Sequence, residues 1–70
     1  MKKALANNLK ALRKINGLSQ EQVADSLDIS QSTYSRIENG ETNSWTFHVE
    51  KVCRLYNISL EALLFKTITK

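Results

Sequence analysis

The stretch that decides the fold covers residues 18–40 and reads LSQEQVADSLDISQSTYSRIENG. Ser19, followed three residues later by Gln22, forms a capping box, in which each side chain bonds the backbone amide of the other at a helix start. Apolar residues at helical spacing follow this box as far as Leu27. The sequence therefore predicts a helix that begins near Gln20 and ends at Leu27.

A second helix is predicted directly after the first. Ser30 offers another N-terminal cap in front of Gln31, and Tyr34 and Ile37 lie three residues apart on one helix face. Gly40 should end this helix, because glycine adopts the left-handed conformation that closes a helix without a side-chain clash. The chain between residues 18 and 40 is therefore expected to form two short helices joined by a tight turn.

The second of these helices has a polar outer face. Helical geometry turns Gln31, Ser32 and Arg36 away from the stripe of Tyr34 and Ile37. Glutamine bonds adenine bidentately, arginine bonds the O6 and N7 atoms of guanine, and serine addresses several base edges. A helix of this kind fits the major groove of B-DNA. The predicted base-reading residues are Gln31, Ser32, Thr33 and Arg36.

The segment resembles the phage-repressor and Cro class of helix-turn-helix proteins, the XRE family. Three motifs carry the resemblance, which extends over about residues 5–65: Leu18-Ser19-Gln20, Val23-Ala24 and Ile37-Glu38-Asn39-Gly40. It implies an all-α, compact five-helix lambda-repressor-like DNA-binding domain, with the helix-turn-helix at helices 2 and 3. The family usually has glycine at the position of Asp28, although aspartate tolerates the left-handed conformation better than most residues.

The resemblance also implies roles for single residues. In the family, a glutamine at the position of Gln20 binds a phosphate and braces the glutamine that here is Gln31. Arg13 and Glu38 match a structural ion pair. The family's basic residues after Gly40 are missing, so polar groups would replace them. The predicted phosphate contacts are Ser19, Gln20, Asn39, Thr42, Asn43 and the hydroxyl of Tyr34, whose ring should pack inward.

The rest of the 70-residue chain completes a single domain, residues 1–70, with a core at about 3–65. Apolar spacing predicts a first helix over 3–16, a fourth over 45–56 and a fifth over 60–65. Trp45, Phe47 and Tyr56 are expected to pack against the core rather than to stack on bases. Residues 66–70 are expected to fray.

The C-terminal region contains more apolar residues than a short terminal helix can bury on a small core. Exposed apolar patches commonly mark interfaces, and members of the resembled family often dimerise through this region. A twofold homodimer is therefore expected, with half-sites about 34 Å apart on a roughly palindromic operator. The predicted dimer interface is Leu60, Leu63, Leu64, Phe65 and Ile68.

Composition and residue spacing argue against a membrane protein, an enzyme and a metal-binding protein. The net charge of +3 and pI of about 9.3 are compatible with a polyanionic partner but do not decide one. The single cysteine, Cys53, and the absence of a signal-peptide pattern or long apolar stretch favour a cytoplasmic protein without a membrane partner. His48 and Cys53 diverge by about 140° on a helix, so neither a catalytic pair nor a metal site is expected. We expect no enzyme activity, cofactor or metal.

Two functions fit these features. The first is a sequence-specific double-stranded DNA-binding transcriptional regulator, such as a repressor that occupies its operator as a homodimer. The second is an antitoxin-like or regulator-subunit module that sequesters a partner protein through the C-terminal apolar patch.

Overall fold

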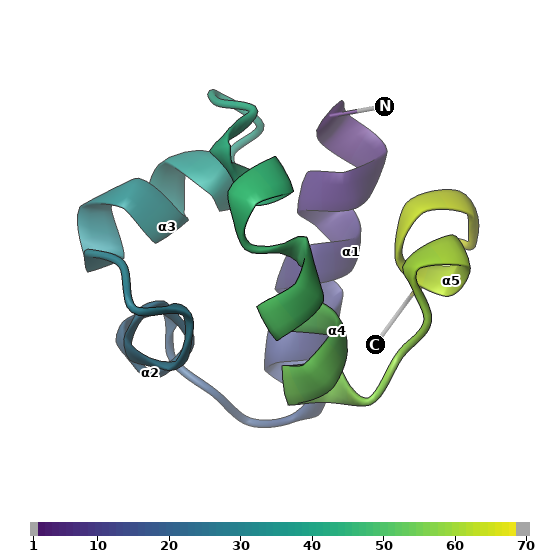
Figure 1. Cartoon of the computed structure of the whole chain (residues 1–70), viewed down its shortest axis with the longest axis horizontal. Helices are drawn as coiled ribbons and strands as arrows, with labels where there is room; N and C mark the ends of the chain where they lie inside the picture. Colours follow the sequence, from purple (N-terminus) through teal and green to yellow (C-terminus); the bar gives the residue numbers. More distant parts are fainter. Residues whose placement is uncertain (1, 69–70) are drawn as a thin grey trace.

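A computed structural model describes residues 2–68 of the chain (Figure 1). Over this range the protein forms five α-helices and one 3-10 helix, with no strand, so the all-α, five-helix prediction is confirmed. The elements are α1 (Lys2–Ile15), α2 (Gln20–Leu27), α3 (Gln31–Glu38), the 3-10 helix η1 (Ser44–Phe47), α4 (Val49–Tyr56) and α5 (Leu60–Phe65). None of these helices is long and apolar enough to cross a membrane.

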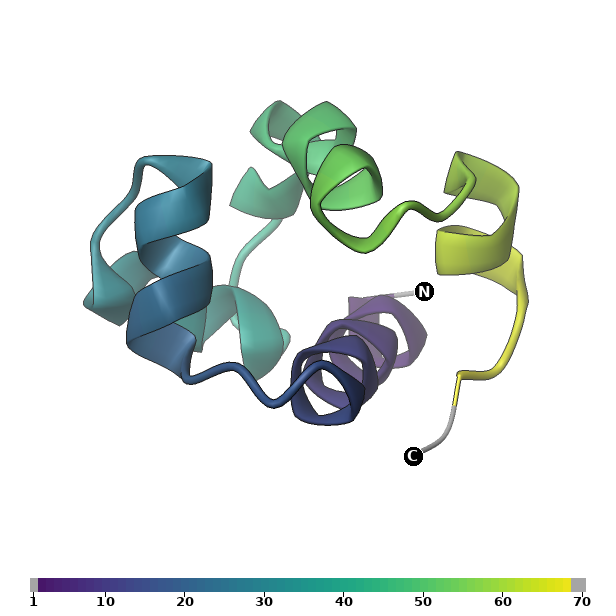
Figure 2. The ribbon, with the colours of Figure 1, turned by 90° about the horizontal axis from the view of Figure 1, so that it is seen from below.

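The helices surround one apolar core. Helices α2 and α3 lie at one end of the molecule and α5 at the other, with α1 and α4 on opposite sides between them (Figures 1 and 2). Each α-helix contributes at least one buried side chain to this core, whereas η1 contributes none. The buried core residues are Leu5, Leu9, Leu12, Val23, Ala24, Leu27, Tyr34, Ile37, Val52 and Leu63.

The ends of the helix-turn-helix follow the local chemistry of the sequence. The Ser19–Gln22 capping box is complete, and the Ser30 side chain accepts a hydrogen bond from the Thr33 amide. Asp28 closes α2 in the left-handed conformation, with φ 61° and ψ 43°, at the position where the XRE family usually has glycine. Gly40, with φ 72°, follows α3 as expected. The turn geometry is therefore kept without glycine.

The prediction of one continuous helix over 45–56 is wrong. The chain instead makes the short 3-10 helix η1 and starts α4 only at Val49, after His48 leaves helical geometry at φ −124° and ψ 5°. The Thr42 hydroxyl oxygen accepts a hydrogen bond from the Ser44 amide, and the Thr46 hydroxyl donates to the Asn43 carbonyl. Such bonds compete with α-helical pairing and stabilise a separate turn.

The segment after α5 is fixed to α1 by Asn8, a residue that the sequence reasoning missed. The Asn8 amide nitrogen donates to the carbonyls of Leu63 and Lys66, at 2.8 and 2.7 Å, and its oxygen accepts from the Ile68 amide at 2.9 Å. Asn8 is 4% exposed. These bonds tie residues 66–68, which were expected to fray, to α1, while residues 69 and 70 lie outside the described range.

An ion pair links α1 to α3. Arg13 Nε and Nη2 donate to the two carboxylate oxygens of Glu38, at 2.7 and 3.1 Å, which confirms the expected pairing. The third donor, Nη1, reaches the Leu18 carbonyl at 3.0 Å. Burial alone would raise the pKa of Glu38, but the hydrogen bonds from Arg13 lower it below its ordinary value. Glu38 is therefore held ionised inside the fold.

Replacement of Asn8 should destabilise the fold. Asn8→Ala leaves buried backbone groups without partners, at a cost of about 2 kcal/mol in the free energy of unfolding. Urea denaturation measures this change. The matched control is Asn7→Ala at the exposed neighbouring position, which should change stability by no more than about 0.5 kcal/mol. Equal stabilities of the two variants would mean that Asn8 does not hold the C-terminal segment.

Acid should destabilise the protein through Glu38. Because its folded pKa lies below the unfolded value of about 4.3, ionised Glu38 stabilises the fold above that pH, and this contribution is lost as pH falls through the folded pKa. Glu38→Gln should cost about 3 kcal/mol at pH 7 and flatten the loss of stability between about pH 5 and pH 3. Urea titrations across this range measure both effects.

The control for that experiment is Glu21→Gln, at an exposed position on α2. It should keep the pH slope of the wild-type protein. An unchanged slope in Glu38→Gln as well would show that the buried ion pair is not the source of acid sensitivity.

Candidate nucleic-acid interface

The outer face of α3 presents three polar side chains to solvent. Gln31, Ser32 and Arg36 are exposed, and their side chains form no hydrogen bond or ion pair with another residue of the described range. The opposite face holds α3 to the core through Tyr34 and Ile37. All donors and acceptors of the outer face are thus available to an external partner, on a helix that is itself fixed.

Thr33 differs from these three residues. It is half-buried at the helix start, where its amide donates to the Ser30 oxygen and its hydroxyl oxygen accepts from the Ser30 hydroxyl at 2.9 Å. Thr33 therefore has a structural role in the N-terminal cap. Its hydroxyl proton remains available to an acceptor outside the protein.

Ser35 is a candidate that the sequence reasoning missed. It is half-buried, and at about 100° per residue it lies between Gln31 and Ser32 around the helix. Helical spacing in the sequence could have identified Ser35, because residues 31, 32, 35 and 36 form one helical face.

Ser19 and Gln20 lie together at the start of α2. The Ser19 hydroxyl oxygen accepts from the Gln22 amide at 3.0 Å, which leaves its hydroxyl proton free. Gln20 Nε2 donates to Glu38 Oε1 at 3.3 Å. The resemblance implied that Gln20 would brace Gln31, but in this structure its amide is instead held by the buried carboxylate of α3. The second amide proton of Gln20 remains available to a phosphate.

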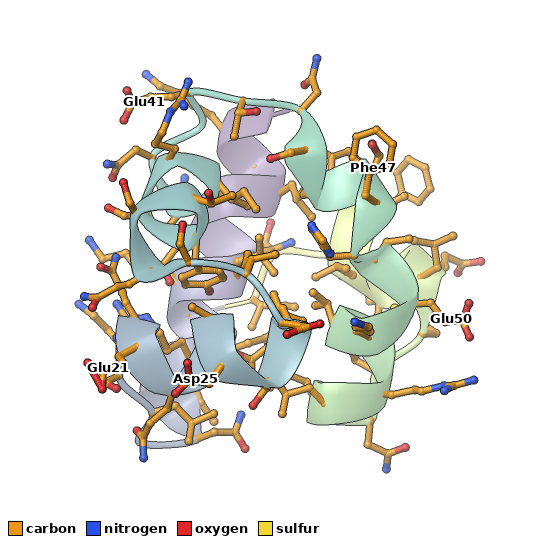
Figure 3. The ribbon with its side chains drawn as sticks, turned by 60° about the vertical axis from the view of Figure 1, so that its left-hand side comes forward. Glu21, Asp25, Glu41, Phe47 and Glu50 are labelled. Atoms are coloured by element: carbon orange, nitrogen blue, oxygen red, sulfur yellow. The ribbon has the colours of Figure 1, made fainter. Side chains whose placement is uncertain are left out.

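The segment after α3 contains an acid beside the expected phosphate contact. The Asn39 side-chain amide donates to the Glu41 carboxylate at 3.2 Å, and both residues are exposed. Figure 3 shows Glu41 projecting at the edge of the molecule. A phosphate that approached Asn39 would meet this negative charge, so Glu41 would have to turn away. Asn43 is exposed, whereas the hydroxyl of half-buried Thr42 already bonds within the turn.

The prediction that the Tyr34 hydroxyl contacts a phosphate is wrong. Its side chain is completely enclosed, and the hydroxyl lies inside the protein near Glu38. Burial, followed by the influence of the Glu38 carboxylate, holds the pKa of Tyr34 far above its ordinary value. Burial also raises the pKa of neighbouring Tyr56 to about 12. Tyr34 therefore anchors α3 as a neutral phenol and cannot reach DNA.

The predicted apolar interface is partly wrong as well. Leu63 is 1% exposed, because its side chain completes the core beneath α5. Leu64 and Ile68 are half-buried against the same core, whereas Leu60 and Phe65 are exposed. Phe47, expected to pack inward, is instead 84% exposed. The apolar surface of the described residues therefore includes η1 as well as α5.

Comparison with known proteins assigns the motif to a family. The model of the Helix-turn-helix family matches residues 9–63, which include the whole of α2, α3, η1 and α4 and parts of α1 and α5. The chain is 42% identical over 65 residues to the control protein C.MunI of Mycoplasma sp, and the match covers 91% of this chain and 86% of that protein.

A second relative is the antitoxin PezA of Streptococcus pneumoniae serotype 4. The chain is 34% identical to it over 55 residues, which is 79% of this chain. The match spans only 35% of the antitoxin, so the chain corresponds to about a third of that protein. No solved structure matches the chain.

The range matched by the family model includes the whole of α2 and α3. The matches indicate a regulatory DNA-binding protein. This chain belongs to the XRE-type Helix-turn-helix family of phage-repressor and Cro-like DNA-binding proteins.

Proposed function

We propose that the protein is a transcriptional regulator that reads double-stranded DNA by inserting α3 into the major groove. The observation that carries this proposal is the outer face of α3, where Gln31, Ser32 and Arg36 are exposed and unpaired on a helix fixed to the core. These side chains have the donors and acceptors that distinguish base pairs in the major groove. A fixed helix lets them act without the entropy loss of ordering a loop.

The size of the molecule supports binding as a homodimer. The eight residues of α3 span about 12 Å, which is the length of three or four base pairs. The longest extent of the protein is 27 Å, shorter than the separation of about 34 Å between successive major-groove faces. One copy therefore reads one short half-site, and a twofold pair reads a roughly palindromic operator.

The proposed contacts divide into two kinds. Gln31, Ser32 and Arg36 read bases, with half-buried Ser35 between them on the same face and Thr33 at its margin. Backbone phosphates are bound by Ser19, Gln20, Asn39, Thr42 and Asn43. Occupancy of the operator in the cytoplasm would then repress transcription by excluding the polymerase, and no cofactor is required for this step.

A second candidate function is an antitoxin-like module that sequesters another protein. The similarity to the antitoxin PezA and the exposed apolar side chains Phe47, Leu60 and Phe65 favour it. The two functions use different surfaces, since α3 lies at the end of the molecule opposite α5 (Figure 1). DNA reading is the better supported, because the family match centres on the helix-turn-helix.

Replacement of Arg36 should change both affinity and sequence preference. Arg36→Ala is expected to cost roughly 1–3 kcal/mol on the preferred operator and to relax the preference at one base pair. The comparison variant Gln20→Ala should weaken binding evenly across sequences, because a phosphate contact carries no base information. Fluorescence anisotropy on single-substitution operators measures both. A uniform loss in Arg36→Ala would reassign this residue to phosphate binding.

Selection of binding sites from random duplex DNA tests the function as a whole. We expect enrichment of a palindrome whose half-sites are separated by one helical turn, with affinity that falls steeply with salt. Enrichment of a single half-site would support base reading by a monomer. If no sequence is enriched while an unrelated protein is bound tightly, the sequestering module is the correct function.

A further inference from the structure

The first acid after α3, Glu41, is held in place by the end of the helix. The Glu41 amide donates to the Arg36 carbonyl at 2.9 Å, and the Gly40 amide donates to the Ile37 carbonyl at 3.1 Å. With Gly40 in the left-handed conformation, these two bonds form the Schellman motif that commonly ends an α-helix. The backbone of Glu41 therefore has a defined position relative to α3, the helix that is proposed to enter the major groove.

The carboxylate of Glu41 has one hydrogen-bond partner among the described residues. Its Oε2 accepts from Asn39 Nδ2 at 3.2 Å, and no ion pair within residues 2–68 includes it. Both side chains are exposed, and Figure 3 shows Glu41 at the edge of the molecule. The contact thus joins an acid to the amide that the proposed function assigns to a DNA phosphate.

The charge of Glu41 does not support the end of α3. The C-terminal end of an α-helix carries partial negative charge, so an acid beside it is unfavourable. The side chain is also exposed and contributes nothing to the core. Packing and helix stability therefore do not explain an acid at this position.

The position of Glu41 matters for the proposed contacts with DNA. Three of the five proposed phosphate contacts, Asn39, Thr42 and Asn43, lie within two residues of it along the chain. Two like unit charges about 4 Å apart in water repel enough to weaken binding about fivefold. Residues 37–50 contain no lysine or arginine, so no lysine or arginine of this segment offsets the repulsion.

The hydrogen bond adds to this effect. A side-chain amide has two protons to donate, and Glu41 accepts one of those of Asn39. A phosphate is left with the second proton, next to a carboxylate of its own sign. The amide is therefore fully available to DNA only when the Glu41 side chain has turned away.

We propose that Glu41 is an autoinhibitory residue of the DNA-binding surface, which lowers the affinity for every duplex by occupying Asn39 and repelling the phosphate that Asn39 would bind. This inference rests on the proposed function and adds to it a residue that acts against binding. Because the repulsion comes from the phosphate backbone, it is the same for all sequences. Phosphate contacts then hold the protein on DNA only weakly, and stable occupancy requires the base contacts of α3.

Affinity measurements on two duplexes test the proposal. Fluorescence anisotropy with the full chain compares the duplex most enriched from random DNA with an unrelated duplex of equal length. Glu41→Gln removes the charge but keeps an acceptor for Asn39, and it should tighten binding about three- to tenfold on both duplexes. The gain should shrink as salt is raised, because salt screens exposed charges.

The matched control is Glu61→Gln, which makes the same change in net charge at an exposed position of α5. Helix α5 lies at the end of the molecule opposite α3 (Figure 1), so the control should change the affinity by less than about twofold. Both variants alter exposed side chains and should keep the thermal stability of the wild-type protein.

A double-mutant cycle tests whether Glu41 acts through Asn39. Glu41→Ala removes both the charge and the acceptor, so it should tighten binding at least as much as Glu41→Gln. In the Asn39→Ala background the same replacement should give a gain at least about twofold smaller, because no amide is left to release. Equal gains in the two backgrounds would overturn the proposal.

The remaining outcomes separate this inference from the proposed function. Unchanged affinity in Glu41→Gln, an equal gain in Glu61→Gln, or an altered preference at one base pair would overturn the inference while base reading stands. If the Glu41 variants tighten binding but every variant binds both duplexes equally well, the inference stands and base reading fails. If neither the wild-type protein nor Glu41→Gln binds either duplex, both proposals fail.

Discussion

The buried carboxylate of Glu38 is the constraint on which the helix-turn-helix depends. It accepts hydrogen bonds from Arg13 of α1 and from Gln20 at the start of α2, while it belongs itself to the last turn of α3. One ionised group thus joins three helices. A buried charge of this kind is tolerated only while its partners are present, so the relative position of the two motif helices is tied to the packing of α1.

This arrangement connects the stability of the fold to the surface that is proposed to face DNA. The side chain of Gln20 is oriented by Glu38, and α3 is anchored by the enclosed ring of Tyr34. The outer face of α3 contributes little to the core, so packing does not restrict which residues occupy it. A chain of 70 residues buries only about 60% of its unfolded surface. The buried hydrogen bonds of Glu38 and Asn8 therefore contribute much to fixing how the helices pack.

Two surfaces of the molecule have different chemistry. Helices α2 and α3 present polar groups at one end, and η1, α4 and α5 present the exposed ring of Phe47 and an apolar groove lined by Val49, Glu50, Cys53 and Leu60 at the other side.

The sequence by itself determined the helix-turn-helix, because caps, left-handed residues and apolar spacing act within a few residues of each other. The Ser19–Gln22 box, Asp28 and Gly40 show this, as does the outward turn of Gln31, Ser32 and Arg36. Tertiary structure alone decided the long-range contacts. Asn8 bonds residues about 55 to 60 positions away, Leu63 and Tyr34 are enclosed by other helices, and Phe47 lies exposed at the end of η1. Local patterns report which face of a helix is apolar, but only the packed chain fixes which of those faces is covered.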